Sequence, residues 1–316
     1  MNIGAMVVCL SMYAAGTFAQ EDGFRAETRV VQVPVSVTDA KGRNVDGLTA
    51  RDFTVLDDGI KREIALDTFG SGAAPISLVI AIQSSGISSP ALARIRRIGG
   101  MIQPLVIGHR GEAAVVAFDE EIKWLREFTS DSETIQKAIN DLTIGSPMQA
   151  RMFDAVIDAA DRMKVRKGRR VLLVISESRD RGSRARLEET IEAVEREGVE
   201  VFAASYSAYA TALTSHTGEL PPPSGPNYLT IFNELARMGK TNHIQALTQA
   251  TGGSDYPFLR ERAVEKAVER LGAEVHSQYI LSYPQRAVSS GMHQIDVSIP
   301  ERRDLRIRSR RAYWVE

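Results

Sequence analysis

The sequence predicts an α/β fold in which a parallel-rich sheet carries helices on both faces, with a small β-module built from strands at the two ends of the chain. Strands that are apolar throughout alternate with amphipathic helices over residues 76–272. Continuous apolar strands are typical of parallel sheets covered on both faces, and such strands are joined by right-handed helical crossovers. Segments with a period of two lie on either side of that region. The length of 316 residues fits about two domains.

The N-terminus has the pattern of a signal peptide. Residues 5–19 are small or apolar and uncharged, and the run is shorter than the ~20 residues that span a membrane. Thr17 and Ala19 place small residues at the −3 and −1 positions of a signal peptidase site. We therefore expect residues 1–19 to be cleaved after Ala19, leaving a periplasmic or secreted chain without a membrane span. The first residues lack Lys and Arg, so a buried N-terminal strand or helix is the alternative.

Residues 20–70 are predicted to form an N-terminal β segment. Valines alternate along residues 28–37, which is the pattern of a half-buried strand. Pro34 has no N–H to donate, which favours an edge strand. Two more short strands are expected at 52–56 and 63–68, after turn residues.

The central α/β domain is predicted over residues 75–275, and a proline-rich loop interrupts it at 207–227. Either Ser130 or Asp131 is a suitable N-cap for its second helix. The expected strands are 76–82, 113–118, 122–128, 170–175 and 199–204. The expected helices lie near 89–106, 131–141, 151–164, 184–197, 228–239, 243–251 and 260–272.

Residues 276–316 return to β patterning, with strands expected at 277–283, 293–299 and 304–313. Neither terminal set of strands is large enough to be stable as an isolated sheet. We therefore expect strands from the two ends to pack together, so that the α/β domain is inserted into a β-module. The alternative is that the C-terminal strands only extend the central sheet and the N-terminal strands form a separate appendage. The apolar faces predicted to meet are Val31, Val33, Val35 and Val37 on one side and Ile280, Ile295, Val297 and Ile307 on the other.

Composition and motifs argue against several function classes. Lys and Arg number 39 against 40 Asp and Glu, which disfavours nucleic-acid binding by bulk charge. The sequence contains neither glycine-rich nucleotide-binding motif, nor the G-x-S-x-G turn of α/β hydrolases, nor metal-binding histidine spacing. The histidines suit surface or capping positions. The arginines of residues 302–311 indicate a strand with one solvated basic face, with binding of an acidic surface as the alternative.

The stretches "LVIAIQSSGIS", "RMFDAVIDAA" and "RRVLLVISESRDRGS", in this order, resemble those of a von Willebrand factor A (VWFA) domain. The flanking "VPVSVTDAKGRNVDGLTARDFTVLDDG" and the C-terminal "YILSYPQ" and "HQIDVSIPERRDLRIRSRRAYW" are similar to the VWFA-related proteins common in acidobacteria. The resemblance covers roughly residues 28–314. It implies a Rossmann-like central domain and a non-enzymatic role in protein–protein interaction or adhesion.

The resemblance also implies a metal-ion-dependent adhesion site, made by D-x-S-x-S after the first strand, a Thr before a later helix and an Asp after the fourth strand. Only Ser85 matches this pattern. The other positions hold Gln83, Ile87, Ala150 (or Gln149 if the loop shifts) and Glu177. Because Mg²⁺ prefers a shell of hard oxygen ligands, we expect a degenerate site formed by Ser85, Gln83 and Glu177 that binds Mg²⁺ weakly or not at all.

An enzyme is the alternative, most simply a hydrolase that uses Ser85 with Glu177 or Asp119. That reading requires a general base within about 3 Å of the Ser85 hydroxyl, in a concave pocket. The run Asp119-Glu120-Glu121 otherwise reads as a solvated turn. The expected partner is a protein of unknown identity rather than a nucleic acid.

Overall fold

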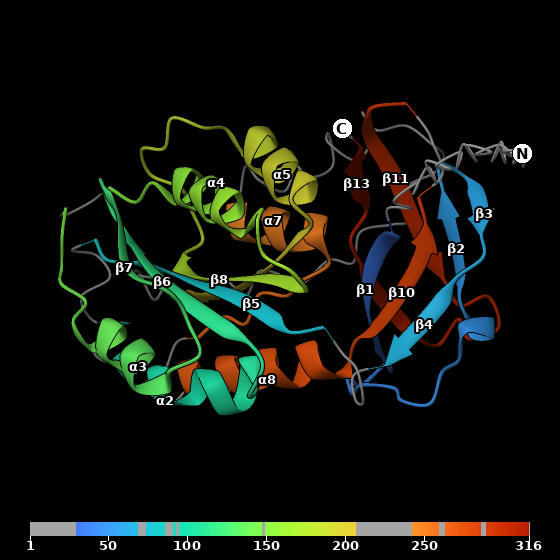
Figure 1. The fold of residues 1–316 in the computed structure, drawn as a ribbon, viewed down its shortest axis with the longest axis horizontal. Coiled ribbons are helices and arrows are strands. Elements are labelled where there is room, and N and C mark those ends of the chain that lie inside the picture. The colour runs from blue at the N-terminus through green and yellow to red at the C-terminus, as the bar shows by residue number, and fades with distance from the viewer. Residues whose placement is uncertain are drawn as a thin grey trace, which may run out of the picture.

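The computed structural model describes residues 30–68, 74–85, 91–92, 95–146, 149–206, 242–258, 263–285 and 289–315. Within these residues an α/β domain lies beside a β-sandwich (Figure 1). The predicted signal peptide, Ile87, the loop 207–227 and the helix 228–239 lie outside the described residues. No helix among the described residues is long and apolar enough to cross a membrane.

The central sheet has five strands in the order β7-β6-β5-β8-β9. All neighbours are parallel except the β6–β7 pair, which is antiparallel. This confirms the predicted parallel-rich sheet. Chain order reverses between β5 and β8, and such a switch point is where open α/β sheets bind ligands, beyond the carboxyl ends of the strands. The strands are β5 (Ile76–Gln83), β6 (Glu112–Phe118), β7 (Ile122–Thr129), β8 (Arg169–Glu177) and β9 (Val199–Tyr206).

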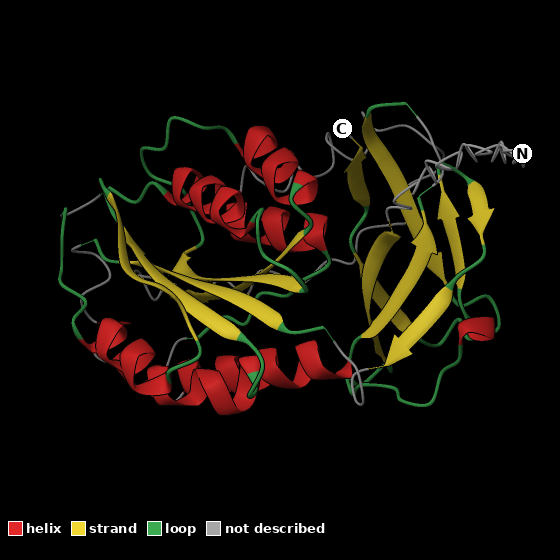
Figure 2. Cartoon of the chain, viewed as in Figure 1, coloured by secondary structure: helices red, strands yellow, loops and turns green. Residues whose placement is uncertain are grey.

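Helices cover both faces of this sheet (Figure 2), and each face has its own apolar core. One face carries α2 (Gly99–Ile102), α3 (Ser132–Asn140) and α8 (Ala263–Ser277). The other carries α4 (Met152–Met163), α5 (Leu187–Arg196) and α7 (His243–Thr251). The Asp131 carboxylate accepts hydrogen bonds from the backbone N–H groups of Glu133 and Thr134, so it is the N-cap of α3, as one of the two expected candidates.

The helix expected at 89–106 is broken in its described part. A 3₁₀ turn over Arg96–Ile98 leads into α2, and a π-helical turn over Gln103–Ile107 follows. Gly99 explains the tight approach to α3, since a Cβ at this position would lie 2.7 Å from the Gln136 Cα. Close helix packing has replaced regular helical geometry here.

The β-module predicted from the two chain ends is present as two sheets of four strands, ordered β12-β1-β10-β4 and β13-β11-β2-β3. Each sheet contains strands from both ends of the chain. β1 pairs with β10, although almost the whole central domain lies between them in the sequence. The N-terminal strands are β1 (Val30–Thr38), β2 (Thr54–Asp57), β3 (Ile60–Arg62) and β4 (Ala65–Thr68). The C-terminal strands are β10 (Tyr279–Pro284), β11 (Gly291–Ser298), β12 (Arg306–Ser309) and β13 (Ala312–Val315).

The sandwich core corrects one predicted face. Val31, Val33, Val35 and Val37 of β1 are buried in it, together with Ile295 and Val297, as expected. On β10, however, the core residues are Tyr279, Leu281 and Tyr283. Because successive side chains of a strand point to opposite faces, Ile280 points away from the core, and the prediction that it lies there was wrong.

Three further expectations about these strands were wrong. β1 is an interior strand despite Pro34, which the structure accommodates because β12 covers β1 only from Val35 to Thr38. The predicted strand 304–313 is divided between the two sheets as β12 and β13. Its arginines do not form one solvated face, since Arg308 is paired with Glu274 of α8 and Arg310 donates to the backbone oxygen of Glu195 on α5.

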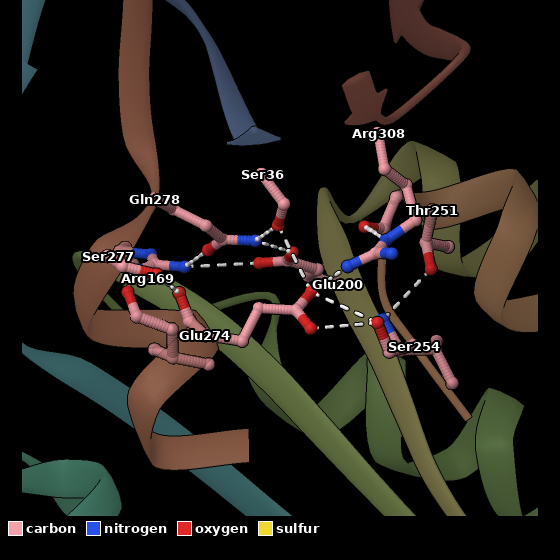
Figure 3. Close-up of polar contacts among 12 residues, drawn as sticks. Ser36, Arg169, Glu200, Thr251, Ser254, Glu274, Ser277, Gln278 and Arg308 are labelled. Carbon is pink, nitrogen blue, oxygen red and sulfur yellow. Dashed lines mark hydrogen bonds and ion pairs between the residues drawn. The ribbon is translucent and has the colours of Figure 1, made fainter. Parts of the chain in front are cut away.

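A polar cluster joins the sandwich to the α/β domain (Figure 3). Arg169, at the start of β8, donates to Glu200 at 3.1 Å, and Gln278 contacts both residues. Gln278 Nε2 also donates to Ser36 on β1. Buried charges are tolerated when they are paired and hydrogen-bonded, so this cluster fixes strand β1 against the ends of β8 and β9.

Candidate functional site

The sequence-predicted residues meet at the carboxyl ends of β5, β6 and β8. Gln83 ends β5, Glu177 ends β8 and Asp119 follows β6, while Ser84 and Ser85 continue beyond β5. All five side chains are buried, and Gln83 and Ser85 are 0% exposed. The site therefore lies at the switch point of the sheet, beneath its surface loops.

The Gln83 carboxamide connects the two strands that flank the switch point. Its Nε2 donates to the Ser85 hydroxyl at 2.7 Å, and its Oε1 accepts the backbone N–H of Glu177 at 2.9 Å. Both polar ends of the amide are thus engaged inside the protein. A glutamine suits this position because it can donate and accept at once, which a carboxylate cannot.

Asp119 extends the network to β6. Its Oδ2 accepts the Ser84 hydroxyl at 3.1 Å and its Oδ1 accepts the backbone N–H of Glu121. A Cβ at Gly145 would overlap Asp119 Oδ2 at 1.7 Å, so a glycine allows the neighbouring loop to approach. The expectation of a solvated turn was wrong for Asp119, which is buried, although Glu120 and Glu121 are exposed.

The positions expected for the remaining ligands carry other contacts. Glu177 Oε2 is paired with the Arg181 guanidinium at 3.2 Å. Ala150 is buried, and its backbone exchanges two hydrogen bonds with that of Arg181, at 2.8 and 2.9 Å. A methyl group therefore occupies the position where a ligating threonine would stand.

Two aspartates that the sequence analysis did not single out organise the loop after β8. Asp154 accepts the backbone N–H groups of Arg184 and Ala185 and the Arg151 guanidinium. Burial opposes ionisation of Asp154, but these donors together lower the pKa of its carboxyl. Asp180 Oδ1 accepts the N–H of Phe153 at the first turn of α4, at 3.1 Å. Both aspartates tie the loop 178–186 to α4.

The residues do not fit the Mg²⁺ ion that the VWFA resemblance implies. A hard cation needs several oxygen ligands, but the amide oxygen of Gln83 is committed to a backbone N–H and the carboxylate of Glu177 to an arginine. The Arg181 guanidinium beside the Glu177 carboxylate also opposes a cation there. In this arrangement Gln83 and Glu177 contact groups of the protein itself.

The arrangement does not match the hydrolase alternative either. Asp119 Oδ2 faces the Ser84 hydroxyl, and Glu177 is paired with Arg181. The Ser85 hydroxyl oxygen accepts a hydrogen bond from the Gln83 amide, and Ser85 is 0% exposed. A nucleophile must reach its substrate, and this hydroxyl is enclosed.

A second cluster, in the sandwich, brings Asp57, Asp58 and His293 within metal-binding distance of one another. Its donors are engaged: Asp57 is paired with Arg62, and the two ring nitrogens of His293 contact Asp58 and the backbone oxygen of Ser289. Asp58 has a φ of 50° in a tight Asp-Gly hairpin turn. The cluster fixes this turn. Of the surface or capping positions expected for the histidines, His293 does not take a surface one, since it is buried.

No known protein-family profile matches the sequence, and no curated protein matches it. Among solved structures, a von Willebrand factor type A protein from Catenulispora acidiphila is 9% identical, with a TM-score of 0.47, covering 86% of this chain and 71% of that one. The BatB protein of Bacteroides thetaiotaomicron is 12% identical, with a TM-score of 0.44 over 63% of this chain and 98% of its own. The vWF domain of the pilus tip protein Mfa5 from Porphyromonas gingivalis is 18% identical, with a TM-score of 0.30, covering 35% and 40%.

At these identities and TM-scores, the matches do not show that this chain shares an activity or a partner with those proteins. The assignment rests on the chain itself. Its motifs occur in the expected order along the sequence, and the five strands form a doubly wound sheet with three helices on each face in the described residues. The α/β domain that begins at β5 and ends with α8 therefore has a doubly wound fold consistent with that of von Willebrand factor A domains.

Proposed function

We propose that this chain is an exported, non-enzymatic protein-binding module that uses the carboxyl edge of its central sheet without a metal ion. The single observation that carries this proposal is the Gln83 carboxamide. It stands where a metal site needs a carboxylate, and it is hydrogen-bonded to Ser85 and to the backbone of Glu177. Because the polar groups of the site are bonded to one another, it is better suited to holding a protein-binding surface above it than to carrying out a reaction.

The surface above this network has the character of a contact site. Ile144 is 53% exposed. Its neighbours hold it against the network, because Leu142 is buried and the N–H of Gly145 donates to the backbone oxygen of Ser84. Arg179 and Arg184 are exposed on the loop 178–186, which Asp154 and Asp180 anchor. Loops held by a rigid scaffold are where binding residues concentrate, and Ile144 adds one exposed apolar side chain beside these arginines.

The test is capture of a partner from an extract of the producing organism, with cross-links mapped by mass spectrometry. We expect cross-links at residues 142–146 and 178–186, and equal capture in EDTA and in millimolar Mg²⁺. Ile144→Asp should weaken capture about tenfold or more, because it places a charge in the contact. Val165→Asp is the matched control, since Val165 is 82% exposed beyond the end of α4. Capture that requires Mg²⁺, or equal loss in both variants, would contradict the proposal.

Export is tested separately. The uncharged N-terminus with Thr17 and Ala19 predicts a mature chain that begins at Gln20. N-terminal sequencing of the protein from the periplasmic or secreted fraction should find Gln20. A mature chain that begins at Met1 would contradict export by this route.

A further inference from the structure

We propose that a groove between the β-sandwich and the α/β domain binds an extended acidic segment of a partner protein. The groove is lined by the sandwich strands β11 and β12, the end of β1 with its following loop, and by α7, α8 and residues 254–256 of the α/β domain. The proposed contact surface is formed by other residues, 142–146 and 178–186. The groove is therefore a second surface, and it does not depend on the proposed function.

The groove is too large for a typical small-molecule site. Its cavity volume is about 1190 Å³, above the ~300–1,000 Å³ of most ligand pockets. It runs from the loop after β1 along β12 and β11 to α7 and α8. A space of this size bounded by two domains suits a segment of polypeptide.

The charge of the groove is positive, in a chain whose net charge is −1. Five arginines line it, against three carboxylates. Glu274 and Arg308 are paired with each other, so the other charges are four arginines against Asp296 and Asp304, and Asp304 is paired with Arg302 outside the groove. The arginines are Arg270, Arg303, Arg306, Arg308 and Arg311. Charge complementarity therefore favours an acidic occupant.

The floor of the groove favours an extended polypeptide over other polyanions. The strands β11 and β12 diverge here, because β11 pairs with β13 and β2 while β12 pairs with β1. Within the described residues no pairing joins β11 to β12, and β12 is the outermost strand of its sheet. The apolar floor at this divergence is the half-buried Ile307, beside Ile295, Val297 and Leu305, which pack in the sandwich core and are only 4–9% exposed.

A strand edge beside apolar side chains is the arrangement that binds an added strand. A segment in which acidic and apolar residues alternate would direct one set of side chains to the arginines and the other to the apolar floor. A nucleic acid could use the arginines alone, so the apolar floor would add nothing to its binding.

Fluorescence anisotropy tests this with a labelled ten-residue peptide in which Glu alternates with Val and Thr, and with the same peptide carrying Lys in place of Glu. We expect saturable binding of the Glu peptide alone. Arg303→Glu/Arg306→Glu should raise its Kd about tenfold or more. The charge-matched control Arg97→Glu/Arg126→Glu, at exposed positions of the α/β domain, should leave Kd within about twofold.

Three results would overturn the proposal: no saturable binding of the Glu peptide, equal weakening in both double variants, or equally tight binding of a ten-nucleotide single-stranded DNA with the same sensitivity to the groove variant. Ile144→Asp separates this surface from the proposed function, because it should leave peptide binding unchanged. The peptide-binding assay and the partner-capture assay can then fail independently of each other.

Discussion

The Ser36 hydroxyl of β1 donates a hydrogen bond to Glu274 Oε1 of α8 at 3.1 Å, although 238 residues separate them along the chain. Glu274 also accepts the hydroxyls of Ser254 and Tyr256 and is paired with Arg308 of β12. One carboxylate of the α/β domain therefore holds strands from both ends of the chain (Figure 3).

Glu274→Gln should lower the free energy of unfolding by about 1–3 kcal/mol, because it leaves Arg308 without its partner and weakens three hydroxyl contacts. Glu269→Gln, at an exposed position of the same helix, should change it by less than about 0.5 kcal/mol. Urea unfolding measures both. Equal effects of the two variants would show that Glu274 does not couple the domains.

Deletion of residues 20–68 should abolish the cooperative unfolding transition or cause aggregation. The deletion removes β1 to β4, so the apolar faces of β10 and β11 that pack against them would be exposed. Size-exclusion chromatography and thermal unfolding follow both effects. A monomeric truncated protein with an unchanged Tm would contradict the shared core and favour an independent N-terminal segment.

Gln83→Ala should destabilise the fold by about 1–3 kcal/mol, since it leaves the buried N–H of Glu177 without its acceptor. Gln149→Ala is the matched control, because Gln149 is exposed near the same edge of the sheet. Denaturant unfolding at neutral pH compares the two. If Gln83→Ala is no more destabilising than Gln149→Ala, the carboxamide does not hold the strand ends together.

Glu195 should make the protein less stable as the pH rises from about 4.5 to 7. Burial raises the pKa of its carboxyl from 4.5 to about 7, and Arg310, which contacts the backbone oxygen of Glu195, only partly opposes this. The folded state then holds a proton that the unfolded state loses, so folding weakens across that interval and stays weaker above it.

Glu195→Gln should remove this pH dependence. As the pH rises from 4 to 8, the free energy of unfolding of the variant should increase relative to that of the wild type by about 1–3 kcal/mol. Glu188→Gln, at an exposed position of the same helix, should leave the wild-type pH profile unchanged. A Glu195→Gln profile parallel to the wild type would exclude this residue as the cause.

Local sequence patterns predicted most of the described elements, because hydrophobic periodicity and capping residues act over a few positions. The errors arose where distant contacts decide the outcome. Pro34 can lie in an interior strand because the pairing of β12 with β1 ends at Val35. The pairing of β10 with β1 and β4 fixes its register, so that Ile280 points away from the sandwich core. The interdomain role of Glu274 depends on residues far apart in sequence, which no local pattern reveals.

The candidate site was predictable in position but not in its bonding. Strand ends placed Gln83, Ser85 and Glu177 together, as the sequence indicated. The pairing of Glu177 with Arg181 and the anchoring roles of Asp154 and Asp180 follow from the path of the loop after β8, which composition does not specify. An acidic residue in the first turn of α4 was the one available signal for Asp154.

The central claim is that the carboxyl edge of the central sheet binds its partner without a metal ion. The most direct test is a thermal-shift titration with Mg²⁺ and Mn²⁺, compared with EDTA. Wild type should gain well under ~1 kcal/mol at millimolar metal, as linkage requires when Kd exceeds the ligand concentration. The variant Gln83→Asp/Ile87→Ser/Ala150→Thr restores oxygen ligands and should gain metal-dependent stability. A clear Mg²⁺ shift in the wild type that Glu177→Ala abolishes would contradict the account.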